Sequence, residues 1–185
     1  YNVSAGSLCS LTVPASGTWA ITAQGPWTTS FMQVCGGFDW RYNSGAGQYL
    51  SDCWKFDTAS WTSMSGLPSP ARSDFAAATL AGKAYVIGGK SASVTYGKDT
   101  TSYVYDTWTA KTDLTTGVYA NTATSDGTWI ISIGTGDSGG SYPYNRTTVY
   151  NPSSNTWSSL TDPNYPHMYS SIVYTGFAGG GSWVF

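Results

Sequence analysis

The stretch Ala84-Tyr-Val-Ile-Gly-Gly89 decides the fold, because an apolar run that ends on paired glycines occurs three times in this chain. Each run is followed by a short segment rich in aromatic residues and then by a tryptophan. The other two runs are Phe31-Met-Gln-Val-Cys-Gly-Gly37 and, with one glycine replaced, Trp129-Ile-Ile-Ser-Ile-Gly134. The tryptophans that follow, Trp61, Trp108 and Trp157, are 47 and 49 residues apart. Repeats of this length indicate a propeller or a solenoid.

Short segments that are rich in apolar, aromatic or β-branched residues predict β-strands along the whole chain. The expected strands are residues 18–23, 31–35, 85–87, 103–105, 129–133, 147–150 and 171–174. Residues 74–80 contain good helix formers, but they are few and lead into a turn at Ala81-Gly-Lys83, so we interpret them as a strand too. The chain therefore has an expected all-β fold.

Division of the chain by the repeat predicts an arm at residues 1–14 and a series of units. The units are residues 15–66, 67–115 and 116–162, followed by a partial unit at residues 163–185. A twisted four-stranded sheet cannot bury both of its faces alone, and radial stacking also protects sheet edges. A propeller has about 4 to 8 blades. We therefore expect these three and a half blades to belong to a larger ring, completed by the rest of a longer chain or by another chain.

Three segments resemble the repeats of the Kelch family of β-propellers. They are the segment from Leu67-Pro-Ser-Pro through Gly89, the segment Asp52-Cys-Trp-Lys-Phe-Asp57 with Trp61, and Val149-Tyr-Asn-Pro-Ser-Ser-Asn-Thr-Trp157. The similarity extends from about residue 30 to residue 185, whereas residues 1–29 do not match. It implies a Kelch-like β-propeller of four-stranded blades, in which the paired glycines close the second strand and the tyrosine and tryptophan pack between blades.

The composition argues against two classes of partner. Charged residues make up 10% of the chain, against about 25% in average soluble proteins, and 51 residues are Ser or Thr. The net charge of −2 and eight scattered Lys and Arg residues provide no basic patch for nucleic acid or an anionic membrane. No stretch has the roughly 18 consecutive apolar residues that membrane insertion requires. Such a surface is typical of extracellular proteins, so we expect secretion.

The three cysteines fit neither a zinc site nor a redox pair, because they are 26 and 18 residues apart. Cys35 ends one predicted strand and Cys53 begins the next, so we expect a disulfide across the hairpin. Two reduced, buried cysteines are the alternative in a cytosolic protein. Cys9 either stays free or pairs outside this segment. The sequons at Asn2 and Asn145 predict N-glycosylation in a secreted protein.

No catalytic site, metal site or cofactor is predicted. Gly136-Asp-Ser-Gly-Gly-Ser141 matches the nucleophile segment of chymotrypsin-like proteases, but their histidine precedes the serine, whereas the only histidine, His167, follows Ser138. A secreted galactose-oxidase-like copper enzyme is a further alternative, since that enzyme also has a Kelch-like propeller. Its copper site needs two histidines, which only a longer chain could supply.

The loops that follow the glycines, residues 38–49, 91–101 and 137–146, are the expected recognition surface, since long loops commonly carry binding residues. Their candidate binding residues are Trp40, Tyr42, Tyr96, Tyr142 and Tyr144. Such rings stack on sugars or fill partner pockets, and the alternative is that they cover their own sheets.

We predict an extracellular structural or protein-interaction module, with carbohydrate binding through the loop aromatics as the first alternative.

Overall fold

The structure is a computed structural model that describes residues 20–24, 31–41, 46–104, 106–136, 144–165, 167–177 and 180–184. All regular elements in these residues are β-strands, which confirms the predicted all-β class. The strands are β1 (Ala20–Gln24), β2 (Phe31–Asp39), β3 (Gln48–Phe56), β4 (Trp61–Met64), β5 (Ala76–Leu80), β6 (Lys83–Ile87), β7 (Thr100–Val104), β8 (Thr107–Ala110), β9 (Val118–Ser125), β10 (Ile130–Gly136), β11 (Tyr144–Asn151), β12 (Thr156–Ser159), β13 (Val173–Phe177) and β14 (Gly180–Val184). These residues contain no helix that could span a bilayer. The predicted arm at residues 1–14 lies outside them.

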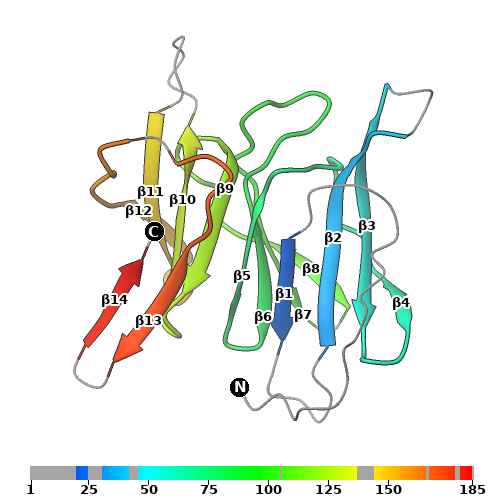
Figure 1. Ribbon diagram of the computed structural model, residues 1–185, viewed down its shortest axis with the longest axis horizontal. Coiled ribbons are helices and arrows are strands. Elements are labelled where there is room, and N and C mark those ends of the chain that lie inside the picture. The colour runs from blue at the N-terminus through cyan, green and yellow to red at the C-terminus, as the bar shows by residue number, and fades with distance from the viewer. Residues whose placement is uncertain are drawn as a thin grey trace.

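The strands form three four-stranded antiparallel sheets and one two-stranded sheet (Figure 1). The first sheet consists of β1 to β4, the second of β5 to β8 and the third of β9 to β12, and β13 and β14 form the terminal hairpin. Spatial order equals chain order within each sheet, as in an antiparallel meander. The antiparallel four-stranded sheets expected from the repeat are therefore present.

The second sheet shows how the sequence produces these strands. Ala76, Ala78 and Leu80 are buried, whereas the residues between them are half-buried. Successive side chains in a strand point to opposite faces, so this alternation directs one face of β5 to the interior. Residues 76–80 are thus a strand, as predicted. The turn that follows has positive φ at both Ala81 and Gly82, 51° and 72°, which a two-residue type I′ hairpin requires.

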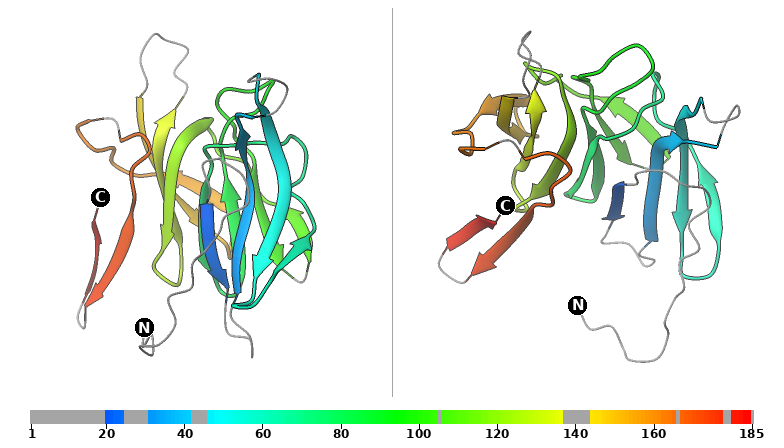
Figure 2. Two further views of the ribbon diagram at one scale, coloured as in Figure 1. Left: turned by 45° about the vertical axis from the view of Figure 1, so that its right-hand side comes forward. Right: turned by 45° about the horizontal axis from the view of Figure 1, so that its top comes forward.

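Both faces of the second sheet pack against neighbouring sheets (Figure 2). On one face, Val86 and Trp108 join a cluster with Cys35, Cys53 and Met64 of the first sheet. Full burial of a side chain of this size stabilises a fold by about 1.5–3 kcal/mol. The first and second sheets are therefore held together mainly by apolar contact.

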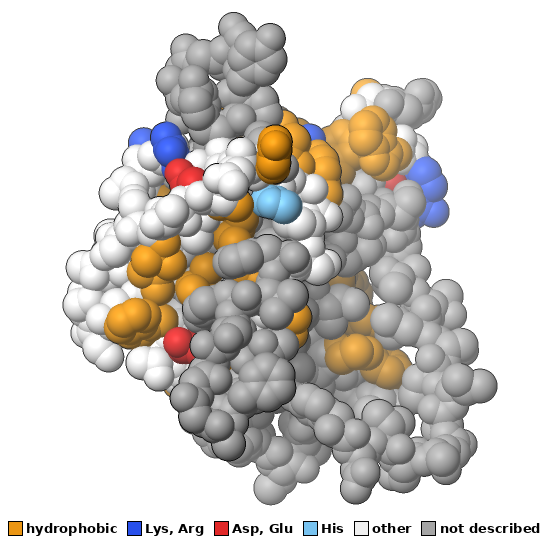
Figure 3. Space-filling model, turned by 60° about the vertical axis from the view of Figure 1, so that its left-hand side comes forward, with side chains coloured by type: hydrophobic (Ala, Val, Ile, Leu, Met, Phe, Trp, Pro, Cys, Tyr) orange, Lys and Arg blue, Asp and Glu red, His pale blue; other side chains and the backbone are white. Residues whose placement is uncertain are grey.

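A second apolar cluster joins the opposite face of the second sheet to the third sheet. Its members are Ala76, Ala78, Leu80, Tyr85, Ile87, Leu114, Val118, Ile130 and Tyr150, with Ala123 and Trp157 packed against them. On the far face of the third sheet, Ile131, Ile133 and Val149 form a smaller cluster with Ile172, which precedes β13. The sheets thus stack in chain order along an arc that is not closed among the described residues (Figure 2). On the side that carries the terminal hairpin, the described side chains include few charges (Figure 3).

Backbone hydrogen bonds connect the sheets near the start of their first strands. Asp74, Ala120 and Tyr169 lie there and share a left-handed backbone, with φ of 53°, 51° and 52°. The Ala120 N–H donates to the Asp74 carbonyl over 2.8 Å, and the Tyr169 N–H donates to the Ala120 carbonyl over 3.0 Å. The conformation recurs after 46 and 49 residues, and the bond occurs twice, so these successive sheets are related by one repeated arrangement.

The first glycine of each complete pair has a left-handed backbone next to the following sheet. Gly36 and Gly88 have φ of 57° and 66°. A Cβ atom at Gly88 would lie 2.7 Å from Val118 Cγ2 and 2.9 Å from the Val118 carbonyl oxygen, and one at Gly36 would lie 2.8 Å from the Arg72 carbonyl oxygen. Glycine is therefore required both by the backbone conformation and by the close approach of the next sheet.

The β2–β3 hairpin is longer than predicted. Phe38 and Tyr49, which we expected in a loop, are direct partners in the two strands, beyond an irregularity between Cys35 and Gly37. Their rings meet edge to face with centroids 4.9 Å apart. A cross-strand aromatic pair of this kind contributes about 0.2–1 kcal/mol to a sheet. The aromatic pair thus extends the ladder, and the loop begins only at Trp40 (Figure 1).

Gly88→Ala should destabilise the protein more than Gly127→Ala. Gly127 also has a positive φ, 92°, but an added Cβ would meet nothing within 4 Å, so its substitution costs only the left-handed backbone strain of about 1–2 kcal/mol. Gly88→Ala adds overlap with Val118, which costs a further 1–3 kcal/mol or so. Urea unfolding of both variants measures the difference. Equal losses of stability would contradict the close packing of the second and third sheets at Gly88.

Candidate functional site

Cys35 and Cys53 form a disulfide that links β2 to β3. The two residues are direct partners in the antiparallel register, with Cα atoms 4.1 Å apart. The bond closes a loop with a sequence separation of 18, for which chain-entropy arguments give a stabilisation of about 3 kcal/mol. It lies buried in the cluster between the first and second sheets. Cys9 lies outside the described residues.

The second and third sheets are each bound to the preceding sheet by a tryptophan of their outer strand. Trp108 in β8 donates its indole N–H to the carbonyl of Ser65, which follows β4, over 2.9 Å. Trp157 in β12 donates to the carbonyl of Thr112, which follows β8, over 3.0 Å. Each acceptor lies four residues after the tryptophan of the preceding repeat. The polar contact between sheets therefore recurs with the sequence repeat.

Asp106 adds further hydrogen bonds between the first and second sheets. Its Oδ1 accepts from the backbone N–H of Ser65 at 2.9 Å and from the hydroxyl of Tyr103 at 2.7 Å. The Ser65 hydroxyl in turn donates to the Asp106 carbonyl over 2.9 Å. The Ser65 N–H and the Tyr103 hydroxyl lower the pKa of Asp106. Burial raises the pKa of Tyr103, and the bond to Asp106 raises it further.

Asn155 has the same role between the second and third sheets. Its Oδ1 accepts from the backbone N–H of Thr112 at 3.0 Å and from the hydroxyl of Tyr150 at 2.7 Å. Asp106 and Asn155 both have left-handed backbones, with φ of 58° and 56°. Burial, together with the neighbouring Tyr85, raises the pKa of Tyr150 to about 12. Each set consists of a tyrosine, an Asp or Asn, and a tryptophan of one sheet, and it binds that sheet to the preceding one. We call such a set of three residues a sheet clamp.

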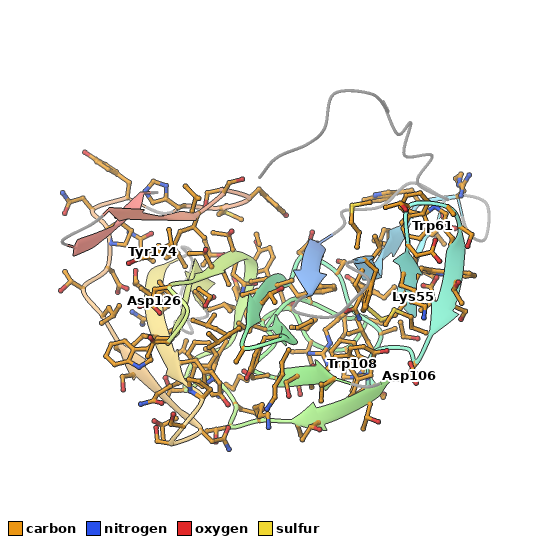
Figure 4. The ribbon with its side chains drawn as sticks, turned by 90° about the horizontal axis from the view of Figure 1, so that it is seen from below. Lys55, Trp61, Asp106, Trp108, Asp126 and Tyr174 are labelled. Carbon is orange, nitrogen blue, oxygen red and sulfur yellow. A yellow bond between two sulfur atoms is a disulfide. The ribbon has the colours of Figure 1, made fainter. Side chains whose placement is uncertain are left out.

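The first sheet has the tryptophan of the sheet clamp but lacks its other two residues. Phe56 stands in the place of the tyrosine, Ala59 in the place of the Asp or Asn, and Trp61 packs on Phe56 with centroids 5.1 Å apart. Met64 faces the second sheet, so Trp61, an odd number of residues away in β4, faces away from it. Figure 4 shows Trp61 apart from Trp108 and Asp106. The Trp61 indole N–H has no hydrogen-bond partner in the described part of the chain.

An open groove of about 700 Å³ lies on the loop side, between the β2–β3 hairpin and loops of the second sheet. Phe38 and residues 46–49 form the hairpin wall, and residues 69–71 and 91–93 form the opposite wall. The lining side chains are aromatic, hydroxyl, amide or small, and none of them carries a charge.

The predicted aromatic binding residues do not form one cluster. Trp40 is 66% exposed and packs edge to face on Phe38, with centroids 4.6 Å apart, so it lies next to the groove. Tyr96 is half-buried and packs on Tyr119 at 5.1 Å instead. Tyr42 and Tyr142 lie outside the described residues, as does the side chain of Tyr144 at the start of β11.

The other sequence candidates lie in separate parts of the chain. Asn145 lies in β11, and its Nδ2 donates to the Pro163 carbonyl. Asn2 and the serine of the protease-like segment, Ser138, lie outside the described residues. His167 is half-buried between β12 and β13. The described residues contain no group of three His, Cys, Asp or Glu side chains that could hold a metal ion.

Sequence reasoning missed two features of these surfaces. The Asp or Asn of the sheet clamp stands two residues before Trp108 and before Trp157, which was a readable signal. Its tyrosine partner was harder to find, because Tyr103 and Tyr150 precede their tryptophans by five and seven residues. The groove gave no sequence signal, because its walls come from three segments of the chain, residues 38–49, 69–71 and 91–93, that only the fold brings together.

Comparison with known proteins does not identify a family. No family model and no curated protein matches this chain. The Kelch resemblance therefore remains a prediction, and the proposals below rest on the contacts of the described residues.

Asp106→Asn should make stability less sensitive to acid. The pKa of Asp106 in the folded protein lies below its usual value of 3.8, so the carboxylate stabilises the fold above that pH and stops doing so as the pH falls through the folded-state pKa. An asparagine keeps the acceptor oxygen, as Asn155 does, but does not titrate. Urea unfolding near pH ~7 and pH ~2.5 should show a smaller acid loss in the variant. An unchanged acid loss would contradict the Asp106 contact.

Asn155→Ala should lower the free energy of unfolding by about 1–3 kcal/mol, because two donors lose their acceptor and alanine tolerates the left-handed backbone poorly. Asn164→Ala is the matched control, since Asn164 is exposed. Its substitution should change stability by less than about 0.5 kcal/mol. Thermal or urea unfolding measures both, and similar effects of the two variants would contradict the sheet clamp.

Proposed function

We propose that this chain is an extracellular structural or protein-interaction module, built as part of a Kelch-like β-propeller, whose first sheet receives a further sheet. The observation that carries the proposal is the sheet clamp. Trp108 and Trp157 each bind the preceding sheet. Trp61 stands at the corresponding place in the first sheet, on the face that points away from the second sheet.

The outward face of the first sheet has the composition of a packing surface. Its residues are those that alternate with Cys35, Cys53 and Met64 along β2, β3 and β4. The apolar ones are Met32, Val34, Trp54, Phe56 and Trp61. None of them belongs to the clusters that join the described sheets. Val34 is buried and the other four are half-buried. Apolar side chains that gather on one face of a sheet are suited to packing against another element.

The third sheet offers the complementary group. Thr161 lies four residues after Trp157, as Ser65 and Thr112 lie after the tryptophans before them. It is exposed, and it follows β12 as those residues follow β4 and β8. The donor half of a sheet clamp thus lies on the first sheet and an acceptor half on the third. A second copy of this chain, or a further part of a longer chain, fits such a surface.

Three observations support an extracellular setting. The Cys35–Cys53 disulfide is the kind of bond that persists in oxidising compartments. Hydroxyl groups rather than ions provide most of the side-chain polarity. The sequons at Asn2 and Asn145 are glycan acceptors in a secreted protein. The proposal includes no catalytic role.

The purified chain should associate at micromolar concentrations, and Trp61→Ala should weaken this association at least about tenfold, because a central tryptophan dominates such interfaces. Trp129→Ala is the matched control, since Trp129 is 45% exposed in the turn before β10. Sedimentation equilibrium measures the masses. A 19.6 kDa monomer at every concentration, or equal effects of the two variants, would overturn the proposal.

A further inference from the structure

The groove on the loop side has the size and position of a ligand site that is separate from the sheet clamps. Its volume of about 700 Å³ falls within the roughly 300–1,000 Å³ of small-molecule sites. It opens between the β2–β3 hairpin and the loops of the second sheet, whereas the clamp residues lie in and around the outer strands. Occupancy of the groove is therefore compatible with sheet association.

One wall of the groove holds aromatic rings in fixed positions. The Phe38 ring packs on Tyr49 at 4.9 Å and on Trp40 at 4.6 Å, with interplanar angles of 71° in both pairs. A Cβ atom at Gly47 would overlap the Phe38 ring, so the ring lies directly against the hairpin backbone. Trp40 remains 66% exposed. An exposed tryptophan that packs on a lining residue of the groove is suited to stacking on a flat, weakly polar ligand face.

The remaining lining groups are neutral hydrogen-bonding side chains. Gln48 lies on the hairpin wall, and Ser69 and Ser93 lie on the opposite wall. The Ser91 hydroxyl already accepts the backbone N–H of Val94 at 3.1 Å, which fixes the loop that carries Ser93. The serines and the amide can each donate and accept hydrogen bonds. This wall therefore matches a ligand that is rich in hydroxyl groups.

The groove favours an uncharged ligand. Two cations directly adjoin lining residues along the chain, and both are paired. The Nζ of Lys90 lies 3.0 Å from the Asp74 carboxylate, and the Nη1 of the buried Arg72 lies 3.4 Å from the Asp99 carboxylate. Asp39 is likewise paired with Arg41 at 3.5 Å. A phosphate or an acidic sugar would lose hydration without gaining an opposite charge, which is unfavourable. Neutral sugars carry no charge, so their binding does not include this desolvation cost.

We infer that this groove binds a neutral oligosaccharide. The apolar C–H face of one pyranose ring stacks on Trp40, and its hydroxyl groups bond to Gln48, Ser69 and Ser93. A proline-rich peptide is the other ligand that aromatic grooves commonly take, but such grooves present aromatic side chains along their length. Here only the hairpin wall is aromatic, and the facing wall consists of Ser, Ala and Pro.

The test is calorimetric titration of the whole chain with cellopentaose, chitopentaose, mannopentaose and a β-galactan pentaose, with a decaproline peptide as the competing ligand class. We expect at least one pentaose to bind at millimolar or lower concentration. Trp40→Ala should weaken that binding at least about tenfold. Trp129→Ala removes an exposed tryptophan of the β9–β10 turn and should leave binding unchanged. This turn lies at the opposite end of the strands from the tip of the β2–β3 hairpin (Figure 1).

Ala92→Trp provides a second variant that keeps every aromatic residue of the hairpin. Ala92 is exposed in the facing wall, so the added indole should fill the groove and abolish binding without changing the free energy of unfolding. The inference is overturned if no pentaose binds, if decaproline alone binds, or if Ala92→Trp leaves saccharide affinity intact. It is also overturned if Trp40→Ala and Trp129→Ala weaken binding equally.

Discussion

Face-to-face packing of four-stranded sheets is the constraint on which the rest of this structure depends. In β6, Tyr85 and Ile87 pack toward the third sheet, whereas Val86 packs toward the first. A strand with apolar residues on both faces needs a neighbour on both sides. The second sheet has two such neighbours among the described residues. The outward face of the first sheet carries similar residues, and its need for a neighbour leads to the proposed assembly.

Polar contacts at the two ends of each sheet complement this apolar packing. Near the start of the first strands, the backbone bonds through Asp74, Ala120 and Tyr169 hold the sheets at a short distance. At the outer strands, the sheet clamp of Trp157 binds the second and third sheets to each other again, and that of Trp108 binds the first sheet to the second. Two lines of hydrogen bonds with apolar clusters between them restrict both the distance and the angle between sheets.

Much of the fold could be predicted because it is encoded by short-range patterns. Apolar runs such as residues 84–89 predict strands through residue type, and the glycines at their ends mark the close approach of the next sheet. The strand at residues 76–80 was readable, despite its helix-forming composition, because the segment is short and leads into the turn at Ala81-Gly-Lys83. The cysteine pair was predictable because its residues fall at the ends of neighbouring strands.

The candidate sites were harder to predict because they depend on contacts between repeats. The aromatic pair of Phe38 and Tyr49 lengthens the hairpin, and the sequence alone does not show that the two rings meet across it. Tyr96 resembles Trp40 in sequence context, yet it packs on Tyr119 and contributes nothing to the groove. Residue type therefore indicated which side chains can bind ligands, but only the packing of the loops decides which of them are exposed together.

Hydrogen exchange of the tryptophan indole N–H groups, followed by NMR, tests the stacking of the sheets most directly. The indoles of Trp108 and Trp157 donate to carbonyls of the preceding sheets, so both should exchange slowly, with the exposed Trp40 and Trp129 as fast-exchanging references. Slow exchange of both clamp indoles is the result we expect. Exchange of Trp108 and Trp157 as fast as that of Trp129 would show that the sheets do not hold one another in this way.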